Sequence, residues 1–454
     1  MPRGYLALVI ELHHPLPAWG RTSGRDWAEV AVGTYWPLLR AIAAAADAGL
    51  ADCLTLAVSP SWAALAADPD ARARAGAELD RRAEDGVPWR SLRQEVADRW
   101  GHDPLAPLRR AQDAGTIEVI PTTASHTWLP SVARSATVAR AQVALAAADH
   151  TLRFGGRPQG IWLPALAYLP GLEKTIAASG LRYFGVDAEA FRRGTVRPPV
   201  DVFGPLITPP GAAAFGVDPG PSRHVTDPYL RYARDPRYEW PEPAAEAAAD
   251  HADHFVRSWR EQAERWAPGD AAGAPPISLA HLSAFDLGGG WSQGGLWLEQ
   301  VLRRLADSPS WPATTPGRYL DRYPEGPVGR PGPSAGGWLS VRPGHADLLD
   351  RCRLAADLLA DAVERRAGLG PLGRRALAQM ARSLLQAQAL DWHLPPGHAL
   401  STAEALARAE RHLAHLAELS GLLAAGRFDP ARLAALEAGP PYLPEIDPEQ
   451  LAEP

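Results

Sequence analysis

Short apolar runs alternate with segments of helical periodicity over the first two thirds of the chain. The first run, YLALVIELHHP, is continuously apolar and ends in polar residues. This pattern is typical of a strand that is buried on both faces and opens into a site at its carboxyl end. A helical pattern closed by Gly49 follows it. The alternation predicts a parallel α/β sheet or barrel. Further strands are predicted at CLTLAVSP, GTIEVIPTTASHTWLP, PQGIWLPALAYLP, LRYFGVDA and PPISLAHLSAFD.

The alternation is interrupted in two places and gives way to helices towards the end of the chain. Residues 191–243 and 323–345 are rich in Pro, Gly and aromatic residues and have little periodicity, which predicts long loops. Residues 62–114 have the mixed charge and periodicity of solvated helices. From about residue 344 the Leu and Ala stripes are helical almost throughout, which predicts a separate helical domain.

The composition is that of a globular protein and excludes several classes of function. The 454 residues are 46% hydrophobic and 22% charged, which suits a barrel with an accessory domain. A net charge of −6 argues against a nucleic acid or an anionic membrane as a partner. Cys53 and Cys352 lack the spacing of a disulfide framework or a zinc site, and we predict neither a metal site nor a cofactor. The chain shows no leader pattern and no run of about 20 apolar residues, so we expect a cytoplasmic protein.

Polar residues gather at the carboxyl ends of the predicted strands, and tryptophan is abundant. In (β/α) barrels that end of the strands carries the chemistry, although any one of these residues could simply cap a strand or a loop. The 16 tryptophans are either core residues or, beside strand ends, platforms on which a sugar ring can stack. A mouth lined with His, Asp and Trp suits sugar handling, in which carboxylates act as acid, base or nucleophile. The polar strand-end residues are Glu11, His13, His14, His126, Asp187 and Asp286.

The order and spacing of many sequence blocks resemble the α-1,4-glucan branching enzymes of glycoside hydrolase family 57, over nearly the whole chain. LALVIELHHP is similar to the first strand of that family, and AFD is similar to its acid/base strand. GIWLPALAYLPGLEKTIAASGLRYFGVDA resembles the nucleophile strand and the strand after it. Other similar blocks are DWAEVAVGTYWPLL, LTLAVSPSWAALAADP, WGHDPLAPLRRAQDAGTIEVIPTTASHTWLP, AAFGVDPGPSRHV, ARDPRYEW, TPGRYLDRYP and LLQAQALDWHL.

The resemblance implies a fold and a division into domains. The fold is an incomplete (β/α)₇ barrel with inserted loops and an all-helical C-terminal domain that closes over the cleft. We therefore assign residues 1–343 to the barrel, with loop-rich insertions near 60–115 and 191–243. Residues 344–438 are assigned to the helical domain and residues 439–454 to a Pro-rich tail.

The catalytic residues of the family are only partly kept. The family is retaining, so a Glu attacks the anomeric carbon while an Asp about 5–5.5 Å away acts as acid and base. Asp286 matches the acid/base position, but the nucleophile of the Trp-Leu-Pro-Glu motif is replaced by Ala165. The sequence after Asp286, LGGGWSQGGLW, also lacks an acid and a His of the family pattern. Glu11 stands where the family has the first His of His-x-His, which makes it a possible substitute acid.

Several substrate-binding positions are kept according to the same resemblance. The placement of Asp391 and Trp392 at the cleft rests on the resemblance alone, and the alternative is a helix end that packs on the barrel. Tyr229 and Tyr232 are candidates for a mobile Tyr of the family. The residues expected to bind substrate are His13, His126, Trp162, Asp187, Trp291, Asp391 and Trp392.

Three hypotheses for the function follow. In the first, the chain binds α-glucan (maltooligosaccharide, amylose or glycogen) with turnover lost or strongly reduced, and serves a glycogen-metabolism enzyme as a regulatory or scaffolding partner. In the second, it is an active branching enzyme, glucanotransferase or hydrolase that uses Glu11 with Asp286, at the spacing of about 6.5–9.5 Å that inversion requires. The alternative for Glu11 is an ion pair with an Arg at the barrel rim. In the third, the barrel binds an unrelated ligand or protein.

Overall fold

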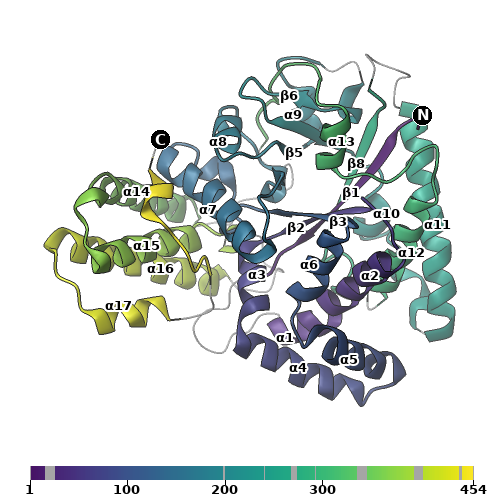
Figure 1. Ribbon diagram of the computed structural model, residues 1–454, viewed down its shortest axis with the longest axis horizontal. Coiled ribbons are helices and arrows are strands. Elements are labelled where there is room, and N and C mark those ends of the chain that lie inside the picture. The colour runs from purple at the N-terminus through teal and green to yellow at the C-terminus, as the bar shows by residue number, and fades with distance from the viewer. Residues whose placement is uncertain are drawn as a thin grey trace.

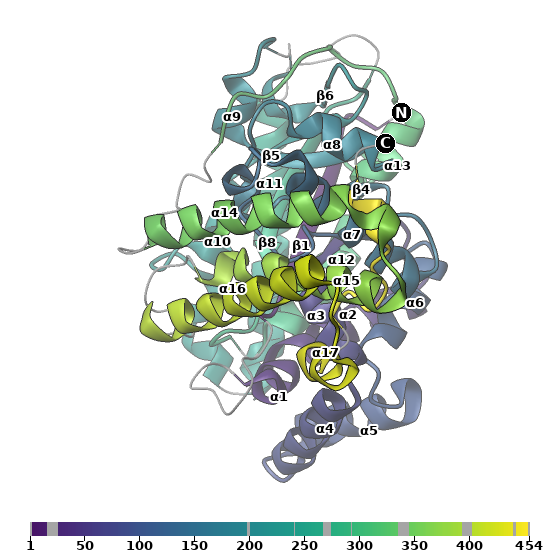
Figure 2. The same ribbon diagram turned by 90° about the vertical axis from the view of Figure 1, so that its left-hand side faces the viewer.

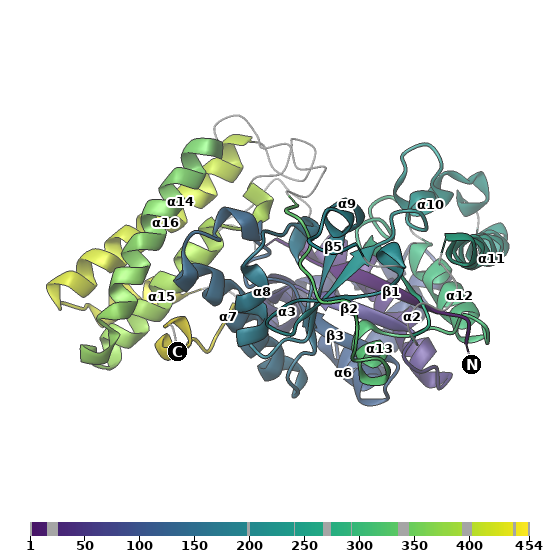
Figure 3. The same ribbon diagram turned by 90° about the horizontal axis from the view of Figure 1, so that it is seen from above.

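The chain folds into a strand barrel covered by helices, with a group of long C-terminal helices on one side (Figure 1). This computed structural model describes residues 2–15, 26–197, 200–239, 241–266, 274–291, 293–334, 345–392, 402–438 and 442–452. The C-terminal helices, coloured green to yellow, lie beside the barrel rather than around it (Figures 1 and 3).

Two four-stranded sheets, in the orders β3-β2-β1-β8 and β4-β5-β7-β6, join to form the barrel. A parallel bridge between Thr122 and Trp162 links β3 to β4, and the amide of Asp218 donates to the carbonyl of Leu279 at 2.8 Å, which links β7 to β8. Only β6 is antiparallel among the described ladders. The structure therefore confirms the predicted (β/α)₇-type barrel. Its strands are β1 (Tyr5–Leu12), β2 (Leu54–Val58), β3 (Ile117–Pro121), β4 (Gly160–Ile161), β5 (Tyr183–Asp187), β7 (Ala213–Val217) and β8 (Ile277–Ser283), with β6 (Leu206–Ile207) at the edge.

Successive residues of β1 face opposite sides of the barrel wall. The odd-numbered side chains from Tyr5 to Val9 lie in the interior cluster, and the even-numbered ones from Leu6 to Leu12 pack beneath the helices. Both faces are buried, which explains why this run is apolar without alternation. The same alternation makes Glu11 the last interior-facing residue of β1, so its carboxylate lies at the mouth.

Gly185 of β5 has no room for a side chain in the packed interior. A β-carbon there would lie 2.5 Å from the ring of Trp162, which is 1% exposed. We expect Gly185→Ala to destabilise the protein by about 1–3 kcal/mol, because the indole is enclosed and cannot move aside. Urea unfolding would measure this cost, with Gly156→Ala as the control, since nothing lies within 4 Å of a β-carbon at Gly156. Equal unfolding midpoints for the two variants would contradict the packing described.

The helices that cover the barrel follow the strands in chain order, and no helix in the described part of the chain is long and apolar enough to cross a membrane. They bury their apolar stripes against the outward-facing side chains of the strands. They are α1 (Trp27–Val30), the π-helical turn Ala31–Tyr35, α2 (Trp36–Asp47), α7 (Ala136–Phe154), α8 (Leu172–Ala178), α11 (Pro241–Trp266), α12 (Gly294–Ala306) and α13 (Pro316–Arg322).

Residues 60–115 are made of helices, as the periodicity of residues 62–114 predicts, and the assignment of a loop-rich insertion there was wrong. Ser59 and Asp68 accept hydrogen bonds from the amides of Trp62 and Ala71, and each precedes a Pro in the first helical turn, so both helices start at well-capped positions. The helical periodicity of the sequence and these caps together explain why the segment is helical. The helices are α3 (Pro60–Ala67), α4 (Pro69–Ala83), α5 (Val87–Trp100) and α6 (Leu105–Asp113).

The second predicted insertion, 191–243, is loop-rich but also contains the barrel strand β7. The prediction of loops was wrong for this strand, because its short run AAFGV lies among Pro and Gly residues that mask it. The other short elements here are the end of α9 (Ala188–Arg192), β6, α10 (Arg223–Thr226) and the 3₁₀ turns Asp201–Phe203, Tyr232–Arg234 and Pro236–Glu239.

Long helices make up the C-terminal region, and α14 and α16 run side by side across it (Figures 2 and 3). Their apolar faces share a core with α7 and α8 of the barrel. The boundary predicted near residue 344 lies outside the described residues. In the tail, Tyr442 is 4% exposed and its hydroxyl donates to the carbonyl of Ala124 at 2.9 Å. The helices are α14 (His345–Glu364), α15 (Pro371–Ala387), α16 (Thr402–Ala425) and α17 (Pro430–Glu437).

Candidate functional site

Glu11 lies at the centre of a cluster of polar side chains at the barrel mouth. Its Oε1 is 3.2 Å from Nδ1 of His126, and its Oε2 is 3.3 Å from Nε2 of His281. Glu11 and His281 come from the adjacent parallel strands β1 and β8, in which Glu11 pairs with Ser283. The alternative prediction of an ion pair with an Arg at the rim was wrong, because the described partners of Glu11 are histidines.

The pKa values of Glu11 and His126 are both lowered in this cluster, which gives the two groups different charges at neutral pH. Burial acts to raise the pKa of Glu11, but the attraction of His126, His281 and His13 outweighs it and holds that pKa below its ordinary value. Burial lowers the pKa of His126 to about 4. Glu11 is therefore a carboxylate at neutral pH, and His126 is a neutral imidazole.

A second buried pair connects the mouth to the C-terminal helices. Nε2 of His13 is 3.0 Å from Oδ1 of Asp391, and its Nδ1 is 2.9 Å from the hydroxyl of Ser59. Burial raises the pKa of Asp391, but the hydrogen bond and positive potential of His13 lower it overall. An ionised Asp391 accepts from Nε2, so in neutral His13 the Nδ1 atom accepts from the Ser59 hydroxyl.

The two pairs are in direct contact through their imidazole rings. His13 stacks on His126 with ring centroids 3.6 Å apart and planes 8° from parallel. The amide of Leu390 donates to the carbonyl of His126 at 3.1 Å, which fixes the 3₁₀ turn Leu390–Trp392 beside the loop after β3. Asp391 thus lies at the mouth, whereas its predicted role in binding substrate stays a prediction.

Asp286 follows β8 and is joined to the same electrostatic cluster. Its Oδ2 accepts a hydrogen bond from the amide of Ser283 at 2.9 Å. Burial raises the pKa of Asp286, and the negative charge of Glu11 acts in the same direction. Arg231 and His281 oppose this rise. A carboxyl group with a raised pKa is suited to hold a proton for transfer.

Ala165 occupies a strained turn at the end of β4. The 3₁₀ turn Pro164–Leu166 has φ values of 59° at Ala165 and 54° at Leu166, two successive non-glycine residues in the left-handed region. Each such residue costs about 1–2 kcal/mol, and strain of this kind concentrates at functional sites. The turn therefore keeps a costly backbone although its side chain is a methyl group.

Three predicted sugar-binding tryptophans are buried. Trp162, Trp291 and Trp392 are 1%, 3% and 3% exposed. Trp162 packs against the ring of His281 at 4.9 Å, and Trp291 packs between Tyr238 and Trp297. This structure leaves them no indole face for stacking on a sugar, so their low exposure does not support the predicted substrate role.

Asp187 is likewise tied to local structure. Its Oδ1 accepts from the amide of Ala190 at 2.7 Å and caps α9, and its Oδ2 accepts from the hydroxyl of Ser334. These contacts explain Asp187 without a ligand.

Of the two candidate tyrosines, Tyr229 is 81% exposed, whereas Tyr232 is buried and bonded to His254.

Sequence reasoning missed His281 and Ser59. His281 follows Ile277 and Leu279 at alternate positions of β8, and both of those face the barrel interior. That spacing could have placed His281 at the mouth. Ser59 comes directly after β2 and caps α3, so its position at a strand end was an equally readable signal.

The barrel is of the (β/α)₇ type, and two family models match separate parts of the chain. Residues 71–216 match the family described as Glycosyl hydrolase family 57, and residues 352–450 match the family described as 1,4-alpha-glucan branching enzyme, C-terminal. These matches confirm the predicted resemblance to the branching enzymes of family 57.

Curated relatives have related names. The chain is 28% identical to the probable 1,4-alpha-glucan branching enzyme Rv3031 of Mycobacterium tuberculosis, over 94% of each chain. It is 26% identical to the 1,4-alpha-glucan branching enzyme TK1436 of Thermococcus kodakarensis, over 86% of this chain and 69% of the relative.

Solved structures agree on the fold. The alpha-amylase AmyC of Thermotoga maritima matches with a TM-score of 0.86 at 22% identity, over 100% of both chains. The GH57-type branching enzyme of Pyrococcus horikoshii matches with a TM-score of 0.83 at 21% identity, over 99% of this chain and 97% of that one. Identities this low establish the fold alone.

Proposed function

We propose that this protein binds α-glucan at the barrel mouth and has lost, or strongly reduced, glycosyl transfer. The relatives named 1,4-alpha-glucan branching enzymes support the ligand class. One solved relative, TK1436, is described in complex with glucose. A glucan binder without turnover would act by presenting its ligand to a second enzyme, so an enzyme of glycogen metabolism is the partner we propose.

The observation that carries the proposal is the methyl group of Ala165. A retaining mechanism needs a carboxylate that bonds to the anomeric carbon. Alanine has no lone pair, so no change of rotamer or pKa can replace that bond. The strained turn around Ala165 supports the idea that the local backbone of the nucleophile position has been kept although the nucleophile has been lost.

The groups that remain are suited to bind sugar hydroxyls. Glu11 and Asp391 have lowered pKa values and accept hydrogen bonds as carboxylates. His13 and His126 are held in place by their stacking and by these carboxylates. The hydrogen-bonding groups that a sugar would contact are therefore already oriented before it binds.

Calorimetric titration of the full chain tests the proposed ligand. We expect maltoheptaose and glycogen to bind, because the mouth keeps its charged hydrogen-bonding groups without the nucleophile. Asp286→Asn should change the affinity by less than about threefold, since binding without turnover does not need its proton. Cellooligosaccharides, with β-linkages, are the control ligand. No heat with any α-glucan, or equal affinity for both ligands, would overturn the proposal.

A second function is favoured by the opposite pKa shifts of Glu11 and Asp286. Burial raises the pKa of Asp286, while the surrounding histidines lower that of Glu11. Carboxyl groups whose pKa values are pushed apart are the usual acid and base of a hydrolase. Glu11 lies near the end of β1 and Asp286 follows the adjacent strand β8, so an inverting hydrolase that uses this pair is the alternative function.

Replacing Glu11 separates the two functions. In our account, Glu11→Gln leaves the rate of reducing-end release from amylose at the wild-type background, because no transfer depends on this carboxylate. The reducing-end assay at high protein concentration is the measurement. A measurable wild-type rate that falls by about a hundredfold or more in Glu11→Gln would instead establish the Glu11–Asp286 hydrolase.

A further inference from the structure

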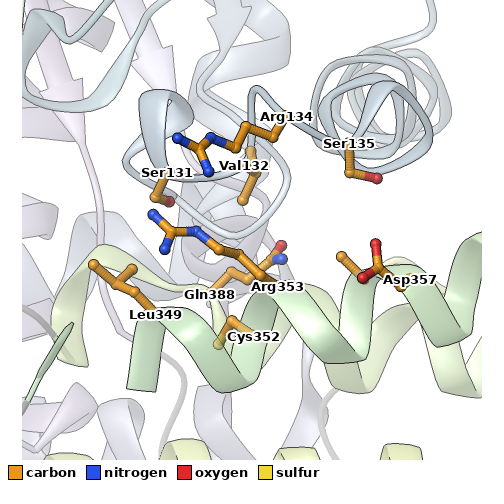
Figure 4. Close-up of a pocket in the computed structure, with 10 residues that line it drawn as sticks. Ser131, Val132, Arg134, Ser135, Leu349, Cys352, Arg353, Asp357 and Gln388 are labelled. Atoms are coloured by element: carbon orange, nitrogen blue, oxygen red, sulfur yellow. The ribbon is translucent and has the colours of Figure 1, made fainter. Parts of the chain in front are cut away.

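A cavity of about 240 Å³ lies away from the barrel mouth, between α14 and the turn that leads into α7 (Figure 4). Ser131 and Arg134 line it from the turn, and Arg353 lines it from the facing side of α14. Gln388, which follows α15, completes the lining. The cavity therefore joins the barrel to the C-terminal helices.

Two arginines from separate elements bring positive charge to one end of this cavity. Figure 4 shows the guanidinium groups of Arg134 and Arg353 on the same side, with the Ser131 hydroxyl beside them. Arg353 forms an ion pair with Asp350 of its own helix, whereas Arg134 has no ion pair within the described ranges. The charge of Arg353 is thus partly neutralised by Asp350, whereas Arg134 would gain a counter-ion from an anion bound between the two guanidinium groups.

The amino end of α7 also lines the cavity. Ser135 lines the cavity and accepts a hydrogen bond from the amide of Val138, so it caps a helix of 19 residues. The amides at the start of such a helix and its dipole favour an anion in front of it. Figure 4 shows Ser135 on the side of Asp357, across the cavity from the guanidinium groups, so the helix end adds positive potential to the cavity as a whole and the arginines alone mark its anion-binding end.

The rest of the lining is mixed: Val132, Leu349, Cys352 and Ala356 are apolar, whereas Gln388 and Asp357 can bond to hydroxyl groups. Gln388 is 5% exposed, and its Oε1 accepts from Nε2 of Gln142 at 3.2 Å. Its carbonyl accepts from the hydroxyl of Thr127 at 2.5 Å, so the residue is held in place before any ligand arrives. Figure 4 shows Asp357 at the end of the cavity opposite the guanidinium groups. A ligand with an anion at one end and hydroxyls at the other matches this arrangement.

We propose that this cavity binds a hexose phosphate, with its phosphate between Arg134 and Arg353 and its sugar hydroxyls towards Gln388 and Asp357. Guanidinium pairs recognise phosphate through several parallel hydrogen bonds. A cavity of about 240 Å³ has room for one sugar ring. The site is separate from the barrel mouth, so it does not depend on the glucan proposed there.

Calorimetric titration of the full chain with glucose 6-phosphate, inorganic phosphate and glucose tests the proposal. We expect glucose 6-phosphate to bind and glucose not to compete with it. Arg134→Gln and Arg353→Gln should each weaken the binding by about tenfold or more, because each removes a charged hydrogen-bond donor. Arg351→Gln is the matched control on the same helix, since Arg351 pairs with Glu410 outside the cavity and its loss should change the affinity by less than about twofold.

The outcomes are distinct. No binding of glucose 6-phosphate, or binding that all three arginine variants weaken equally, overturns the site. Inorganic phosphate that binds as tightly as glucose 6-phosphate overturns the hexose as the ligand. A maltooligosaccharide that competes with glucose 6-phosphate would show that the cavity is a glucan site and would also overturn the proposal.

Discussion

Replacing Ala165 with Glu is expected to give the protein α-glucan transfer or hydrolysis at a rate about a hundredfold or more above its wild-type background. Ala165 already bears the cost of a β-carbon at φ of 59°, so the substitution to Glu adds a carboxylate without a large new backbone cost. Asp286 is half-buried and has a raised pKa, so it can protonate the leaving oxygen.

Ala165→Gln is the matched control, because it adds the same bulk without a nucleophile. Release of reducing ends and formation of α-1,6 linkages from amylose are the measurements. If Ala165→Glu is as silent as Ala165→Gln, a single missing nucleophile does not explain the loss of turnover. The glycine-rich segment after Asp286 would then have to be included in the explanation.

Acid is expected to destabilise the fold well above the pH at which carboxylates titrate. Burial lowers the pKa of His126 to about 4 and that of His150 to about 3, against an ordinary value of 6.5. Below pH 6.5 the unfolded chain takes up protons at these positions while the folded chain does not, so stability is lost as the pH falls. Each histidine contributes up to about 1.4 kcal/mol per pH unit, or about 3 kcal/mol for both between pH 6.5 and 5.

Urea unfolding at each pH measures this loss. His150→Phe should reduce the slope of the unfolding free energy against pH by about 1.4 kcal/mol per unit between pH 4 and 6, because one titrating group is removed. The lowered pKa values of Glu11 and Asp391 add a further loss only when the pH falls below about 4.5. A wild-type stability that is flat from pH 7 to 5 would contradict the buried neutral histidines.

Much of the fold could be predicted from the sequence because its strands are apolar on both faces. A strand that is buried on both faces is a continuous apolar run, and such a run can be recognised in the sequence alone. The strands recognised in this way are β1, β2, β3, β5 and β8. The strand β7 was missed because AAFGV is short and is surrounded by Pro and Gly. The helices of 60–113 were assigned to a loop-rich insertion although their periodicity and caps indicated helices.

The candidate site could be predicted residue by residue, but its contacts could not. Glu11 and His126 are far apart in the chain, and only the closed barrel brings them within 3.2 Å. The sequence therefore gave no reason to pair Glu11 with histidines rather than with an arginine. Trp162 and Trp291 could not be assigned from the sequence either, because a tryptophan that binds sugar and a tryptophan in the core cannot be told apart there. Only the structure shows that both are buried.

Incubation of the wild-type protein with amylose at high protein concentration tests the account most directly. Chain lengths before and after debranching, together with reducing ends, would be measured over many hours alongside calorimetric binding of the same glucan. Our account predicts binding with no change in chain length, branching or reducing ends. New α-1,6 linkages, transferred segments or released sugars, lost in Asp286→Asn, would contradict it.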